Sequence, residues 1–181
     1  MNHNQWEKLK VGIMKKLIVI NGTMGVGKTS TCNKLNEALP KSVFLDGDWC
    51  WNMNPFVVTD ETKEMVTDNI SYLLNSYINC SEFENIIFCW VIHREEILEE
   101  IITKLDNVDY ELHFITLICS EEKLRSRLVK DVENEVREWD IIDRSIKRLQ
   151  NYVLMSSKKI DVSDIEISMT VEKIRDLIVD K

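Results

Sequence analysis

The chain has 181 residues, of which 44% are hydrophobic and 30% charged, a composition typical of a soluble globular protein with one core that needs no disulfide or metal to hold it. Its longest apolar run, 86–92, has seven residues, far fewer than the roughly 18 of a membrane span, which excludes an integral membrane protein. The net charge of −8 repels a nucleic-acid backbone, so nucleic acid is not expected as a partner.

The five cysteines, at positions 32, 50, 80, 89 and 119, are odd in number and show no CxxC spacing. Since no signal peptide precedes them, we expect reduced thiols and a cytoplasmic location. Most of these thiols are expected to act as small buried hydrophobic groups. No zinc site is expected, because His and Cys do not cluster at ligand spacing.

Strands and helices are predicted to alternate along the chain. Residues 1–13 are polar and weakly patterned, so we predict an extension there, with Met14 a candidate for the natural start, and a single domain over 14–181. Short apolar runs predict strands, and apolar residues at helical spacing predict helices. The predicted strands are 17–20, 42–45, 86–92, 112–119 and 160–162; the predicted helices are 28–39, 60–80, 95–105, 121–130, 140–155 and 171–179, the last with Thr170 as its N-cap.

This alternation predicts an α/β fold in which a parallel sheet is covered by helices on both faces.

Four of the five glycines lie within 22–47, where unusual backbone conformations are therefore expected. Within that stretch, GTMGVGKT at 22–29 matches the P-loop pattern GxxxxGK(S/T) between a predicted strand and a predicted helix.

A P-loop binds phosphates through its backbone N–H groups and the start of the following helix. Lys28 is expected to bridge the β- and γ-phosphates, and the Thr29 hydroxyl to ligate Mg²⁺. The predicted nucleotide-binding residues of this segment are Gly22, Thr23, Met24, Gly25, Val26, Gly27, Lys28, Thr29 and Ser30.

The residues that follow the other predicted strands indicate how the nucleotide is used. The run 86–92 ends without an acidic residue, which disfavours an ATPase motor, and 157–161 does not match the NKxD segment of switch GTPases. Acidic residues come instead after the second strand, as Asp46-Gly47-Asp48. This stretch is either a simple turn, which both residue types favour, or a pair of carboxylates for phosphoryl transfer, one on the metal side and one facing the acceptor.

With its P-loop, its Asp-Gly-Asp after strand two and an arginine-rich segment, the chain resembles the P-loop kinases of the nucleoside-monophosphate-kinase-like group, often labelled AAA-type nucleotide kinases. The shikimate kinase, gluconate kinase and chloramphenicol phosphotransferase branch is most similar. The resemblance covers nearly all of 14–181 and implies a three-layer fold with a five-stranded parallel sheet in the order 2-3-1-4-5. It also implies substrate-binding helices at about 48–82 and a lid at about 128–142.

The same resemblance implies that Asp46 holds the Mg²⁺ shell through water and that Asp48 orients the acceptor hydroxyl or accepts its proton. It further implies that an arginine stacks on the adenine, and Arg127 has better spacing for this role than Arg125.

Five of the seven arginines lie in one 24-residue segment that ends at Arg148, and the planar guanidinium suits phosphate recognition. Arg137 falls in the expected lid, while Arg144 and Arg148 share a helix face. We predict that Arg137 and Arg144 stabilise the charge on the transferred group. The alternative is that these arginines form surface ion pairs with Glu133, Glu135 and Glu138.

Aromatic residues cluster where the resemblance places the acceptor. Tryptophan offers a large apolar face and one donor, which suits a ring or a sugar, although a tryptophan can also simply pack in the core. In an extended segment Trp49 and Trp51 would share one side. Arg94, after strand three, is expected to bind an anionic acceptor. The predicted substrate-binding residues are Asp48, Trp49, Trp51, Trp90 and Arg94.

We therefore predict a Mg²⁺-dependent kinase that transfers the γ-phosphoryl group of ATP to a hydroxyl or phosphate of a small-molecule acceptor, as a monomer or homodimer. Lys28, Asp48 and a lid arginine would carry catalysis. One alternative is a non-catalytic nucleotide-binding sensor that reports to a protein partner. Another is a nucleotide kinase in the strict sense, for which Arg94 would be essential.

Overall fold

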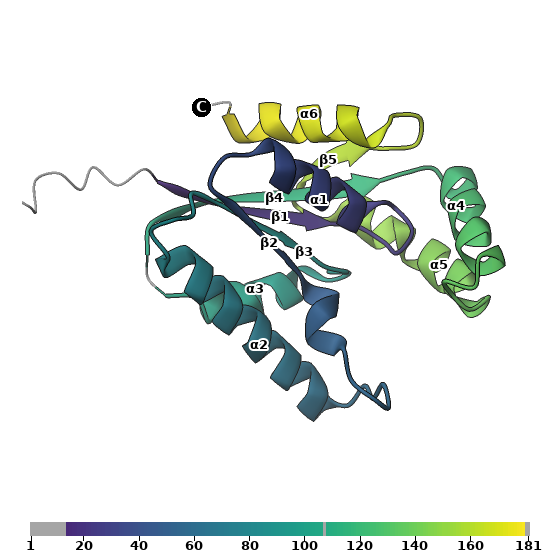
Figure 1. Ribbon diagram of the computed structural model, residues 1–181. Helices are drawn as coiled ribbons and strands as arrows, with labels where there is room; N and C mark the ends of the chain where they lie inside the picture. The colour runs from purple at the N-terminus through teal and green to yellow at the C-terminus, as the bar shows by residue number, and fades with distance from the viewer. Residues whose placement is uncertain (1–13, 107, 180–181) are drawn as a thin grey trace, which may run out of the picture.

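A computed structural model describes residues 14–106 and 108–179 of the protein (Figure 1). The extension predicted for 1–13 lies outside the described residues. In chain order the elements are β1 (Lys15–Asn21), α1 (Lys28–Ala38), β2 (Ser42–Asp46), the 3₁₀ helix η3 (Gly47–Trp51), α2 (Asp60–Asn79), β3 (Asn85–Cys89), α3 (Glu95–Thr103), β4 (Tyr110–Ile118), α4 (Glu121–Glu133), α5 (Asp140–Leu154), β5 (Lys158–Asp161) and α6 (Ile167–Val179).

The strands form one sheet in the order β2-β3-β1-β4-β5, and each neighbouring pair is parallel. This confirms the predicted α/β fold and its 2-3-1-4-5 order. Parallel neighbours need crossover connections, which the helices between the strands provide. The carboxyl ends of β1, β2 and β3 therefore meet along one edge of the sheet, where ligands bind in such folds.

The sheet separates two hydrophobic cores, as the side chains of β1 illustrate. Ile18 and Ile20 belong to the core that contains Leu35 of α1 and Ile174 of α6. Leu17 and Val19 belong to the other, with residues of α2 and α3. In Figure 1, α1 and α6 lie on one side of the sheet, and α2 and α3 lie on the opposite side. A strand buried on both faces reads as an unbroken apolar run, which is why β1 was recognisable in the sequence.

The chain leaves the sheet earlier after β3 than the apolar run 86–92 predicts. The strand ends at Cys89, and the N–H of Ile92 donates to the side-chain Oδ1 of Asn21 at 2.9 Å instead of to a backbone carbonyl of β1. The N–H of Trp90 still donates to the carbonyl of Ile20 in β1 at 3.4 Å, so the chain departs from the backbone ladder after Trp90.

The prediction of Thr170 as an N-cap is wrong, and the extended conformation in which Trp49 and Trp51 would share one side does not occur. Helix α6 begins at Ile167, so Thr170 lies inside the helix, where its hydroxyl donates to the carbonyl of Glu166 at 3.1 Å. Trp49 and Trp51 lie in the 3₁₀ helix η3 and not in an extended segment. The Asp46 carboxylate caps this helix by accepting from the N–H of Asp48 at 3.0 Å, which favours the turn over continued strand.

Among residues 14–106 and 108–179, we find no helix with the length and apolar character of a membrane span.

Candidate active site

The P-loop joins β1 to α1 through backbone that only glycine adopts easily. Gly22, Gly25 and Gly27 have φ of 147°, 77° and 102°. A Cβ on Gly22 would also lie 2.6 Å from the carbonyl oxygen of Leu117. Gly27 is the N-cap of α1 and has no capping side chain, so the first N–H groups of the helix remain available to an anion.

Lys28 is the buried cation of this loop. Its ammonium donates to the carbonyl of Thr23 at 3.1 Å, and only 9% of the residue is exposed. Burial lowers the pKa of Lys28, and the nearby groups that oppose this, Cys89 and the carboxyls of Asp48 and Asp46, do not compensate fully. An anion beside Lys28 would stabilise its charge, as the phosphates of a nucleotide do.

Thr29 and Asp46 bring two oxygen donors together at the end of β2. The Thr29 hydroxyl donates to Asp46 Oδ2 at 2.8 Å, and the Asp46 carboxylate is buried. No cluster of three or more His, Cys, Asp or Glu occurs within the described residues. A hydroxyl and one or two carboxylates fit Mg²⁺, which keeps several waters and takes its other ligands from bound phosphates.

Asp48 lies in the 3₁₀ helix η3, two residues after Asp46. Burial and the neighbouring Asp46 charge raise the pKa of the Asp48 carboxyl, while Lys28, a hydrogen bond from Trp90 and Arg137 act in the opposite direction. The carboxyl is thus close to the P-loop lysine and in an environment that makes it more basic than an ordinary aspartate.

Three adjoining cavities surround these groups. The phosphate cavity, of about 330 Å³, is lined by Met24, Gly25, Gly27, Lys28, Thr29, Ser30, Asp48, Val91, Arg127, Asp131 and Arg137. The β5–α6 cavity, of about 680 Å³, shares Gly25, Gly27, Ser30 and Arg127 with it. The aromatic cavity, of about 760 Å³, shares Met24, Asp48 and Val91 with it. The phosphate cavity therefore lies between the other two.

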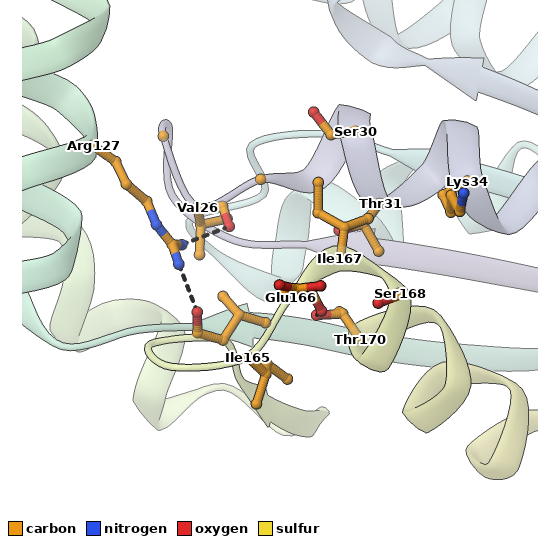
Figure 2. A pocket seen from close by; sticks show the side chains of 13 residues that line it. Val26, Ser30, Thr31, Lys34, Arg127, Ile165, Glu166, Ile167, Ser168 and Thr170 are labelled. Carbon is orange, nitrogen blue, oxygen red and sulfur yellow. Dashed lines mark hydrogen bonds between the residues drawn. The ribbon is translucent and has the colours of Figure 1, made fainter.

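The β5–α6 cavity is closed on one side by Arg127 of α4 (Figure 2). The Arg127 guanidinium donates to the carbonyls of Val26 at 3.3 Å and Val162 at 2.7 Å, and so bridges the P-loop to the end of β5. The opposite wall comes from the start of α6 and the loop before it, which the sequence did not indicate, because no motif marks it. Its residues are Ile165, Glu166, Ile167, Ser168 and Thr170.

All three predicted tryptophans line the aromatic cavity. Trp49 packs edge-on against Phe44 with ring centroids 5.4 Å apart, and Trp51 contacts Phe56 at 5.7 Å. Gly47 is required for this arrangement, since a Cβ at that position would lie 2.6 Å from Cγ of Trp90. The structure adds lining residues outside the predicted set: Asn52, Phe56, Val58, His93 and Arg148.

The arginines divide between cavity and surface. Arg137 lines the phosphate cavity, and its Nε donates to Asp131 at 3.0 Å. Arg144 pairs with Asp140 at 3.6 Å, is half exposed and lines none of the three cavities. Arg94 is likewise exposed and outside them. The structure thus does not bring Arg144 or Arg94 to the site, and it places Arg148 there.

Comparisons with known proteins show the family of the chain. A family model described as "AAA domain" matches residues 18–150. The comparison with curated proteins gave no match.

Solved structures with the same fold include an antibiotic resistance protein and two kinases. The tunicamycin resistance protein of Deinococcus radiodurans has a TM-score of 0.68 and 18% identity, over 92% of this chain and 97% of that one. A gluconokinase from Sinorhizobium meliloti 1021 has a TM-score of 0.63 and 17% sequence identity, over 90% of each chain. The shikimate kinase of Bacteroides thetaiotaomicron has a TM-score of 0.59 and 17% sequence identity, over 90% of this chain and 98% of that one. At these identities the likeness establishes the fold.

Proposed function

The chain belongs to the AAA domain family, with the fold of the nucleoside-monophosphate-kinase-like P-loop kinases, and on that premise we propose that it transfers the γ-phosphoryl group of ATP to a small-molecule acceptor. The observation that carries this proposal is the position of Asp48. Its carboxyl lines the phosphate cavity together with Lys28 and also lines the aromatic cavity. A group that faces both bound nucleotide and a second ligand is what direct transfer between them requires.

Phosphoryl transfer depends mainly on positioning and charge neutralisation. The backbone N–H groups of the P-loop and the Lys28 ammonium would hold the phosphates, and Thr29 and Asp46 would hold Mg²⁺. Bound Mg²⁺ would neutralise part of the phosphate charge. Arg137, on the wall of the phosphate cavity, would stabilise the charge on the transferred group once it exchanges Asp131 for phosphate oxygens.

Asp48 would then act on the acceptor. The acceptor oxygen forms a bond to the γ-phosphorus while the bond from that phosphorus to the bridging oxygen breaks, which releases ADP. When the acceptor is an alcohol, its proton passes to the Asp48 carboxylate, whose raised pKa makes it a better base than an ordinary aspartate.

The test is whether ADP release from Mg-ATP depends on an acceptor. A thermal-shift screen of metabolites in the presence of a non-hydrolysable ATP analogue selects candidates, because a ligand that binds the native state raises Tm. A kinase releases ADP only when an effective acceptor is added and forms one phosphorylated product per ADP. A nucleotide-dependent sensor would instead bind ATP without acceptor-dependent ADP release, and that result would contradict the proposal.

A further inference from the structure

Asn21, the last residue of β1, is a fully buried amide directly before the P-loop. We propose that Asn21 is a positioning residue, which fixes the chain after β3 and the end of α5 relative to the P-loop. This inference goes beyond the proposed function but rests on it in one respect, because positioning matters for catalysis only if the ligands of the two sides react with each other.

An amide is an uncommon choice at this place in the core. The residues before it in β1, 17–20, are all apolar and buried, and an apolar side chain at position 21 would avoid the cost of burying a polar group. An amide carries both donors and an acceptor, and Asn21 uses them on different segments of the chain. The residue therefore makes contacts that an apolar side chain could not make.

The acceptor of Asn21 holds the chain after β3. Its Oδ1 accepts from the N–H of Ile92 at 2.9 Å, two residues after the last ladder bond, which Trp90 donates. Ile92 is fully buried, so its N–H would be costly to leave unpaired. The neighbours of Ile92, Val91 and His93, line the aromatic cavity, and Val91 also lines the phosphate cavity. The Asn21 amide thus sets where this part of the cavity wall lies.

The donor of Asn21 holds the end of α5. Its Nδ2 donates to Sδ of Met155 at 3.1 Å and, over a longer distance of 3.5 Å, to the Thr116 hydroxyl. Met155 is buried and is the C-cap of α5. Arg148 precedes it by seven residues, about two helical turns, and lines the aromatic cavity. The helix that carries Arg148 is therefore tied to the residue before the P-loop.

Thr23 forms a second link between the P-loop and α5. Its hydroxyl donates to the carbonyl of Ser145 at 3.3 Å, and both residues are buried. Loss of the Asn21 amide would therefore leave α5 with this link, while the N–H of Ile92 would lose its partner. We expect the segment 90–93 to depend on Asn21 more strongly than α5 does.

The placement of the cavity wall matters for phosphoryl transfer, which requires the acceptor in line with the bond that breaks. A displacement of about 1 Å can lower the rate by about 10²-fold. Asn21 is bonded to Gly22, the first residue of the P-loop. Its side chain therefore sets the distance between the phosphate-binding backbone and the wall formed by Val91 and His93.

The first test is amide hydrogen exchange of the full chain without ligand, which needs no knowledge of the acceptor. Asn21→Leu replaces the amide with an apolar group of similar size. Exchange in the segment 90–93 should then be at least about tenfold faster, with a smaller increase in 145–155.

Asn85→Leu is the matched control for this test. Asn85 is a buried amide at the other end of β3, donates to the carbonyl of Pro40 at 2.9 Å and lines none of the three cavities. Its loss should destabilise the fold without selective exchange in 90–93. Equal exchange in 90–93 for the two variants, after correction for their global stabilities, would overturn the proposal.

The second test separates positioning from a purely structural role. Asn21→Leu should retain its affinity for the β,γ-imido analogue of ATP, measured by calorimetry with Mg²⁺, while the acceptor KM rises about tenfold and kcat falls about 10²-fold. A merely destabilised protein would have a lower kcat through a smaller folded fraction, with KM unchanged. That outcome, or loss of binding of the analogue, would contradict a positioning role.

Should Asn21→Leu not fold, Asn21→Ser takes its place, because the smaller side chain leaves room for a water beside the N–H of Ile92. It should show the same changes at reduced size. Met155→Leu conserves volume and removes the sulfur acceptor, so it should speed exchange in 145–155 and leave 90–93 unchanged. Wild-type exchange in both of these variants would contradict the assignment.

Failure of this inference and failure of the proposed function give different results. If no acceptor supports ADP release from Mg-ATP, the kinase proposal is contradicted, and hydrogen exchange alone decides whether Asn21 holds the two segments. Acceptor-dependent ADP release with wild-type KM and kcat in Asn21→Leu would contradict the positioning role and leave the kinase proposal intact.

Discussion

The two sides of the candidate active site, the proposed nucleotide side and the proposed acceptor side, are built in opposite ways. The nucleotide side is one contiguous segment, between β1 and α1, in which glycines with positive φ let backbone N–H groups face the ligand. The acceptor side consists of large side chains contributed by η3, the segment after it, the end of β3, and α5. Under the proposed function, one side would recognise a constant chemical group through backbone, and the other would recognise a variable group through side chains.

This difference explains why one fold accommodates many acceptors. A phosphate-binding backbone tolerates little change, whereas aromatic and charged side chains on a separate wall can be exchanged without disturbing it. Asp48 is the residue that the two sides share with chemical consequence. Variants on either side and at Asp48 should therefore fall into distinct classes.

The largest effect is expected on the nucleotide side, from Lys28→Ala. Removal of the buried ammonium takes away the cation expected to bind the phosphates, so kcat measured as acceptor-dependent ADP release should fall by ~10³-fold or more. Lys63→Ala, which removes an exposed lysine of α2 paired with Asp60 at 2.9 Å, should leave kcat unchanged. Near-normal turnover in Lys28→Ala would remove the P-loop from the mechanism.

Asp48→Asn tests the residue that lines both the phosphate cavity and the aromatic cavity. Loss of the base should lower kcat by about 10²–10³-fold while ATP affinity, measured by calorimetry, is retained. The exposed Asp143 on α5 provides the matched control, Asp143→Asn. Loss of ATP binding together with turnover would instead give Asp48 a structural role.

The pH profile of the wild-type protein tests the same assignment. Since the pKa of Asp48 is raised above its ordinary value of 3.8, the carboxylate needed as a base is lost as the pH falls through that higher value. The acidic limb of kcat/KM, which reports the ligand-free protein, should therefore lie above pH 3.8, and it should be absent from the residual activity of Asp48→Asn. An unchanged limb in the variant would assign it to another group.

The nucleotide side could be predicted from the sequence better than the acceptor side could. The P-loop was predictable because its conformation is local and encoded by adjacent residues. The sheet was predictable because strands buried on both faces read as apolar runs. The end of β3 was not, since the apolar run continues through Ile92 while the backbone turns to Asn21, a residue 71 positions away.

The arginines show why the acceptor side is harder to predict. Arg144 and Arg148 are one turn apart on α5, which is about 6 Å along the helix axis. Sequence spacing places them on the same face, but only the position of the helix against the cavity decides that Arg148 lines it and that Arg144 pairs with Asp140. Similarly, the first turn of α6 was missed, because its residues face the β5–α6 cavity and do not extend the apolar pattern.

Gly47→Ala should disturb the acceptor side alone. The new Cβ would lie 2.6 Å from Cγ and 2.7 Å from Cδ1 of Trp90, and overpacking of this kind typically costs about 1–3 kcal/mol of unfolding free energy. Urea denaturation should show this loss, and the KM for the acceptor found by ADP release should rise several-fold with ATP affinity unchanged.

The double variant Gly47→Ala with Trp90→Leu gives the diagnostic result for this contact. It should regain stability, because the smaller side chain leaves room for the new methyl group, while acceptor KM stays high, because the ring is lost. A double variant no more stable than Gly47→Ala would show that the contact with Trp90 is not the cause.

The smallest expected effect is a gain in stability from Asp48→Asn. Because the folded-state pKa of Asp48 is raised, its ionised form is less favourable in the folded than in the unfolded chain. Ionised Asp48 therefore lowers the free energy of unfolding above its folded-state pKa, and this cost disappears below pH 3.8, where the carboxyl is protonated in both states. Since Asp48 is partly exposed, solvent screens the effect, and Tm at pH 7 should rise by only about 1–2 °C.

Calorimetric scans of Asp48→Asn at several pH values measure this gain, and it should shrink both toward acidic pH and with added salt. Asp143→Asn, which removes an exposed carboxylate from the first turn of α5, should show no gain, because that charge favours the helix N-terminus. A residue whose substitution raises Tm and lowers kcat is maintained at a cost to the fold, as expected of a base held near the phosphate cavity. A Tm that falls in Asp48→Asn would mean that the carboxylate stabilises the fold through its neighbours Lys28 and Trp90, and the assignment of Asp48 as the base would then depend on the kinetic result alone.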